Sequence, residues 1–283
     1  MCLNGDKFDH HRIGNNLGLE KHSYKDPTGG IINEKEHIKD LGVYISSDLT
    51  WTRQIEEAVS KARSMAGWTL RTFRTRERIP MITIWNSLIR PCLDYCSPLW
   101  SPRPSNFQEI DLLEDTLRSF TRQVEGMDGL DYAHRLKELG MTSIQRRHER
   151  YKALYLYKIK EGLVPNISST NPLKFRNHGR HGCKCEVPIF PMRGKARKAR
   201  DNSFALTACN LWNSLPVYVR EISGKEVGYF KKKLDKALAL YPDVPRCSDF
   251  GHSYDRNGRK SNSLYVHYQN IEIKRILDHM SSV

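Results

Sequence analysis

Hydrophobic residues recur every three or four positions through most of residues 51–161, and this period predicts a succession of amphipathic helices. The first helix carries the clearest stripe, which consists of Ile55, Val59, Ala62, Ala66, Leu70 and Phe73. Similar stripes follow, and three of the predicted helices end at Gly126, Gly140 and Gly162, since glycine commonly terminates helices. We therefore expect residues 49–162 to form one helical domain whose apolar stripes face a core.

The pattern changes to a period of two near the start of the chain. Leu41, Val43 and Ile45 alternate with less apolar positions, as in a strand with one buried face. Gly29 and Gly30 predict a turn before this strand. Residues 1–48 should therefore contribute a short β-hairpin or sheet remnant, too small to be stable alone and left with an exposed edge.

Residues 163–201 lose any clear period and contain many Pro, Asn, Ser, Gly and His residues. Between Lys174 and Arg200 there are nine Lys and Arg residues and one acid, Glu186, so this segment is predicted to be a basic linker. Helical stripes return in residues 202–241, and residues 242–283 are predicted to be a tail of low order. The expected fold class is thus α+β, mainly α, with a helical bundle and a basic, partly disordered C-terminal extension.

The composition indicates a polyanionic partner. Lys and Arg number 46 against 32 Asp and Glu among 283 residues, a net charge of +14. No apolar run approaches the roughly 20 residues of a membrane span, and the N-terminus has no apolar signal-peptide core. The seven scattered cysteines do not suggest a disulfide framework. We expect an intracellular protein, nuclear or cytoplasmic, without membrane contact.

Two segments resemble a known family. Residues 39–46 read K-D-L-G-V-Y-I-S, and residues 87–100 read S-L-I-R-P-C-L-D-Y-C-S-P-L-W. Both resemble motifs that follow the palm in reverse transcriptases of non-long-terminal-repeat (LINE-like) retrotransposons of the jockey and CR1 type. The pattern S-F…L-W-N-S-L-P from Ser203 to Pro216 is similar to the end of these proteins, so the resemblance spans roughly residues 39–240.

The resemblance implies that residues 1–48 are the last palm strands and that residues 49–162 are a thumb-like domain. The family's catalytic aromatic-x-Asp-Asp motif should lie before Lys39, and no Asp-Asp pair occurs in this chain. Polymerases need clustered carboxylates to hold two metal ions. Glu114 and Asp115 are adjacent, but on a helix they point about 100° apart and suggest a solvated face.

We therefore expect a truncated, reverse transcriptase-derived protein of a mobile element, with no catalytic residue and no cofactor. It should bind RNA, DNA or an RNA–DNA hybrid without sequence preference, because Lys and Arg neutralise phosphates of any sequence. Two alternatives stay open: a helical protein-interaction scaffold of retroelement origin, and part of an active polymerase if a palm is present upstream. No particular oligomeric state is predicted.

Three basic clusters are the candidate nucleic-acid-binding residues. The first comprises Arg71, Arg74, Arg76 and Arg78, the second Arg146, Arg147 and Arg150, and the third Arg193, Lys195, Arg197, Lys198 and Arg200. The first two could equally be solvated helix surface, and the third also fits a nuclear import signal or a flexible connector. Three tyrosines follow the second cluster: Tyr151, Tyr155 and Tyr157. Their helical spacing favours packing in the core over stacking on bases.

A zinc site is a weaker alternative. His178, His181, Cys183 and Cys185 supply four ligand types within eight residues. The Cys-x-Cys spacing is shorter than in most zinc sites, and the order does not match the Cys/Cys/His/Cys knuckle of related elements. We expect ordinary loop residues here and no metal, with zinc as the alternative.

Overall fold

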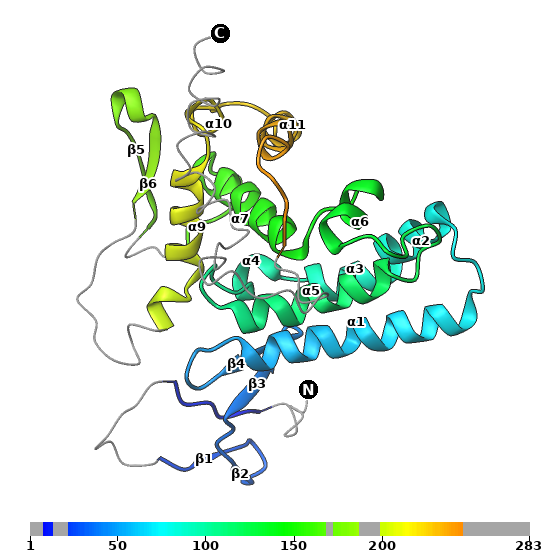
Figure 1. Ribbon diagram of the computed structural model, residues 1–283. Helices are drawn as coiled ribbons and strands as arrows, with labels where there is room; N and C mark the ends of the chain where they lie inside the picture. Colours follow the sequence, from blue (N-terminus) through cyan, green and yellow to red (C-terminus); the bar gives the residue numbers. More distant parts are fainter. Residues whose placement is uncertain (1–7, 14–21, 168–171, 187–198, 246–283) are drawn as a thin grey trace.

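The computed structural model describes residues 8–13, 22–167, 172–186 and 199–245. It confirms the α+β, mainly helical fold class. Short β-hairpins lie at one end, a long helix, α1 (Thr52–Thr72), leads away from them, and most of the later helices stack above it (Figure 1). A third hairpin, formed by residues 174–186, projects from the helical body away from the other two (Figure 1).

The N-terminal strands form two separate two-stranded antiparallel sheets. One pairs β1 (Tyr24–Lys25) with β2 (Ile31–Ile32), and the other pairs β3 (His37–Asp40) with β4 (Val43–Ser46). Both sheets are hairpins, as expected for a region that holds few residues per strand.

The predicted strand through Leu41 is wrong at its start. Leu41 and Gly42 form the turn between β3 and β4, with φ of 45° and 86°. Positive φ at both central positions is typical of a two-residue hairpin turn. Leu41 is consequently 85% exposed, while Val43 is buried. A period-two pattern cannot distinguish a strand residue from a turn residue of the same polarity.

The predicted stripe on α1 faces the first of two hydrophobic cores. Ile55, Val59 and Ala62 are buried there, and Ala66 and Leu70 are partly buried. Phe73 lies beyond the helix end and is exposed, so its assignment to the stripe is wrong. Four segments face α1 across this core: α2 (Arg78–Ile84), η2 (Trp85–Ile89), α3 (Arg90–Asp94) and α5 (Phe107–Thr121).

The segment η2 is a π-helical turn that ends at Ile89, two residues before Pro91. Proline lacks an N–H group and its ring clashes with the carbonyl of the preceding turn in a regular α-helix. A widened turn removes that clash, and helical backbone continues to Asp94. The short helix α4 (Ser97–Trp100) precedes α5 in the chain, and the short helix α6 (Tyr132–Glu138) follows it.

Helix α7 (Ile144–Lys160) joins both cores. Ile144 packs in the first core, whereas Leu156 and Tyr157 pack in the second. The second core includes α9 (Phe204–Ser214), α10 (Val217–Arg220) and α11 (Val227–Leu238). Tyr157 stacks on Phe230 with ring centroids 4.0 Å apart. Residues on the two sides of the predicted domain boundary at 162 therefore share one core.

The basic linker is more ordered than its composition indicates. Strands β5 (Lys174–Asn177) and β6 (Cys183–Glu186) form an antiparallel hairpin with a 3-10 turn, η3 (Gly179–His181), at its end. Cys185 and Phe175 pack against the second core, which explains why this polar segment is structured. The prediction of a linker without regular structure is wrong for these residues.

Buried polar groups fix the start of α7. The Ser143 hydroxyl accepts a hydrogen bond from the N–H of Arg146 at 3.1 Å. Glu114 of α5 accepts one from the N–H of Gln145 at 2.8 Å and another from the Tyr132 hydroxyl at 2.6 Å. Glu114 is buried, so its predicted place on a solvated face is wrong. Burial raises the pKa of Glu114 to about 7.

Candidate nucleic-acid interface

The loop that connects α1 to α2 is shaped by Arg76. Its guanidinium donates hydrogen bonds to the carbonyls of Leu70, Phe73 and Thr75 at 2.9, 2.7 and 2.8 Å. The last carbonyls of a helix have no partner within the helix, and Arg76 supplies one. The carbonyl of Arg76 in turn accepts a bond from the N–H of Glu125 at 2.8 Å. Arg76 is therefore a structural residue, although it was predicted to contact nucleic acid.

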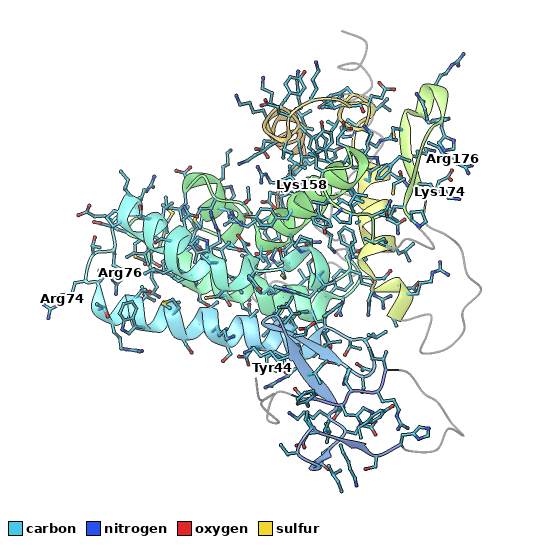
Figure 2. The ribbon with its side chains drawn as sticks, turned by 180° about the vertical axis from the view of Figure 1, so that it is seen from behind. Tyr44, Arg74, Arg76, Lys158, Lys174 and Arg176 are labelled. Atoms are coloured by element: carbon cyan, nitrogen blue, oxygen red, sulfur yellow. The ribbon has the colours of Figure 1, made fainter. Side chains whose placement is uncertain are left out.

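The other arginines of the first cluster face solvent. Arg71, Arg74 and Arg78 are exposed, and Figure 2 shows Arg74 at the outer end of the helical body. Arg78 lies 3.9 Å from the carboxylate of Glu138. An ion pair between such exposed groups contributes little energy, so the guanidinium stays available for another anion.

Two aromatic rings lie beside these arginines. Trp68 and Phe73 are 49% and 40% exposed, and their rings meet edge to face with centroids 6.4 Å apart. Exposed rings next to cations are typical of surfaces that bind nucleic acid, because bases stack on the rings while cations contact phosphates. Trp68 is not among the residues predicted from the sequence, although its position outside the apolar stripe of α1 indicates exposure. We call Trp68, Arg71, Phe73, Arg74 and Arg78 the helix tip.

The second cluster lines a cleft of about 1200 Å³ between α6, α7, α11 and residues 241–245. Arg146 is only 3% exposed and donates to the carbonyl of Pro242 at 3.0 Å. Arg150 makes a two-point bond with the carboxylate of Asp235, at 2.5 and 2.9 Å. This bond raises the pKa of Arg150. Arg147 is half-buried and interacts electrostatically with Asp94.

These contacts change the interpretation of the second cluster. Arg146 and Arg150 hold α7 to the segment around α11, and the cleft also contains the carboxylates of Asp131, Asp235 and Asp243. The cluster was predicted as an exposed basic surface, which is wrong for Arg146 because it is buried. Because these carboxylates repel phosphate, the cleft is less suited to binding a nucleic-acid backbone than the helix tip.

The third cluster falls mostly outside the described residues. This applies to Arg193, Lys195, Arg197 and Lys198. Arg200 is half-buried in a short helical turn before α9. The β5–β6 hairpin adds exposed cations that were not selected from the sequence, and Figure 2 shows two of them, Lys174 and Arg176.

The alternative prediction of a zinc site at His178, His181, Cys183 and Cys185 is wrong, because the structure does not bring these side chains together. His178 and His181 are exposed near the turn of the hairpin, whereas Cys185 is buried against the second core. Throughout the described part of the chain, no three His, Cys, Asp or Glu side chains gather into a metal site. Cys185 instead forms a hydrogen bond with Cys209, which raises the pKa of Cys185.

The chain was compared with protein-family models, curated proteins and solved structures, and none of them matches it. Within the ranges that the structure describes, no helix is both long enough and apolar enough to cross a membrane.

Proposed function

We propose that the chain derives from the C-terminal part of a LINE-like reverse transcriptase and binds nucleic acid without catalysing polymerisation. The family origin is supported by the sequence motifs of residues 39–46 and 87–100. The residues of this chain include no Asp-Asp pair that could hold a polymerase's two metal ions, so the proposal assigns them no catalytic role.

The observation that carries the binding proposal is the helix tip. Arg71 and Arg74 are exposed at the end of a 21-residue helix, beside the exposed rings of Trp68 and Phe73. Arginine binds phosphate through two parallel hydrogen bonds, and every duplex presents phosphates along its backbone whatever its sequence. The tip should therefore bind a duplex or an RNA–DNA hybrid through its backbone, without sequence preference.

The test measures binding of a fluorescently labelled RNA–DNA hybrid by anisotropy over a series of salt concentrations. The double variant Arg71→Gln/Arg74→Gln should lower affinity about tenfold or more at low salt. It should also reduce the slope of log affinity against log salt by about 2, since two phosphate contacts are lost.

A matched control removes the same charge elsewhere on the same helix. Arg53 and Lys61 both lie near Glu57 on α1, ten or more residues before Arg71. The double variant Arg53→Gln/Lys61→Gln should bind the hybrid nearly as well as the original protein. Equal losses in both double variants would show that overall charge, rather than the tip, determines binding. No binding by the original protein at low salt would reject the proposal.

A further inference from the structure

A groove of about 390 Å³ runs between α7 and α11, beside the segment that joins α3 to α4. Tyr151, Leu154, Tyr155 and Lys158 of α7 line it, and Lys231 of α11 lies opposite. Figure 2 shows Lys158 on α7 close to α11. This groove is separate from the helix tip, because Figure 2 shows Arg74 at the outer end of the helical body and Lys158 nearer its middle.

The sequence of α7 places these side chains together. Residues 151, 154, 155 and 158 share one face of the helix because they are three or four positions apart. The opposite face carries Ala153, Leu156 and Tyr157, which are buried in the second core. Tyr155 is left 39% exposed, and its ring is held edge to face against Phe204 with centroids 5.4 Å apart.

Asp94 is the carboxylate that lines the groove, and it already has partners. Asp94 accepts a hydrogen bond from the Tyr151 hydroxyl at 3.0 Å and lies 3.3 Å from Nε of Arg90. Arg150, which also lines the groove, is bound to Asp235, as described above. Lys158 and Lys231 form no ion pair within the described ranges, and further lysines follow on α11. The groove therefore presents free positive charge beside an aromatic ring.

We infer that this groove binds single-stranded nucleic acid, with a base stacked on Tyr155 and phosphates on Lys158 and Lys231. The inference rests on the proposed nucleic-acid binding and adds a second site with a different ligand form. In a duplex both faces of each base are already stacked, so a ring at a groove wall requires an unpaired strand. An acidic peptide would satisfy the lysines but has no base for the tyrosine ring.

The test uses a fluorescently labelled oligouridine of about 12 nucleotides, within the site size of single-strand binders. Tyr155→Leu keeps an apolar side chain beside Phe204 and removes the ring. It should weaken oligouridine binding by about fivefold or more, because one stacking contact is lost. Lys158→Gln/Lys231→Gln should reduce the salt slope by about 1.4.

Both kinds of variant have a matched control on α11. Tyr229 is exposed and Lys232 is adjacent to Lys231, but neither lines the groove. Lys236 of α11 is likewise exposed and outside the groove, so Tyr229→Leu and the double variant Lys232→Gln/Lys236→Gln should leave oligouridine affinity nearly unchanged. Circular dichroism and thermal unfolding establish that each variant is folded.

The outcomes separate this inference from the proposed function. If hybrid binding depends on Arg71 and Arg74 while oligouridine binding is unaffected by Tyr155→Leu, the groove is not a stacking site and the inference fails alone. If an oligoglutamate competes as well as oligouridine does, the groove is a site for acidic peptides and the inference is overturned. Binding of neither nucleic acid would reject both proposals.

Discussion

The hydroxyl of Tyr95 donates a hydrogen bond to the carbonyl oxygen of Leu41 at 2.7 Å, although the two residues are 54 positions apart. Leu41 lies in the turn between β3 and β4, and Tyr95 follows α3. A Cβ atom on the neighbouring Gly42 would lie 3.5 Å from the Tyr95 ring. Segments 39–46 and 87–100 therefore contact each other although they are distant in sequence, and this joint attaches the β3–β4 hairpin to the helices.

Tyr95→Phe should lower the free energy of unfolding by about 1 kcal/mol, because it removes one hydrogen bond and little apolar area. Urea denaturation followed by circular dichroism measures the change. Tyr229→Phe is the matched control, since Tyr229 is similarly exposed and its hydroxyl has no partner within the described residues. A similar loss in both variants would mean that the bond to Leu41 does not stabilise the joint.

Arg76 should contribute to the stability of the fold, whereas Arg74 should contribute to nucleic-acid binding. Arg76→Met removes the donor for three carbonyls and should destabilise the protein by about 2 kcal/mol. Arg74→Met changes an exposed side chain and should alter stability by less than about 0.5 kcal/mol, while weakening hybrid binding. Urea denaturation and anisotropy together test this division. A stable Arg76→Met variant would contradict the structural role.

Glu114 should make the protein less stable as pH rises through neutrality. Its pKa is about 7 in the folded state, against an ordinary value of 4.5, so the folded state binds the proton more tightly. The free energy of unfolding should fall between about pH 5 and pH 8, by up to roughly 3 kcal/mol. Glu114→Gln keeps an acceptor for Gln145 and should remove this dependence. Glu125→Gln, at an exposed position, should retain it.

The sequence predicts the helices better than it predicts which polar residues are buried. The stripe of Ile55, Val59 and Ala62 identifies α1 because a period of 3.6 residues is a local property. The burial of Glu114 depends on Tyr132 and the start of α7, which are distant in sequence. The β5–β6 hairpin was missed for the same reason, since its order depends on packing against the second core.

The candidate site was predicted in part. Arg71 and Arg74 lie on the exposed helix tip, but Arg76 lies inside the same cluster and caps the helix. Composition cannot separate these roles, because a guanidinium serves equally well as a helix cap or as a phosphate ligand. Trp68 lies outside the apolar stripe of α1, so its exposure follows from the same period that identifies the helix.

His148 should make the protein less stable as the pH falls, which is the opposite of the pH dependence expected from Glu114. Its Nε2 lies 3.0 Å from the carbonyl of Leu93, and burial lowers the pKa of His148 to about 3. In the unfolded chain this histidine is protonated below about pH 6.5, whereas in the folded state it stays neutral until about pH 3. The free energy of unfolding therefore falls as the pH drops from about 6.5 toward 3. His148→Gln preserves a donor for Leu93 and should lose less stability in acid. Urea denaturation at several pH values measures this change, with the exposed His22→Gln variant as the control. If His148→Gln loses as much stability in acid as the original protein, the loss is caused by other groups.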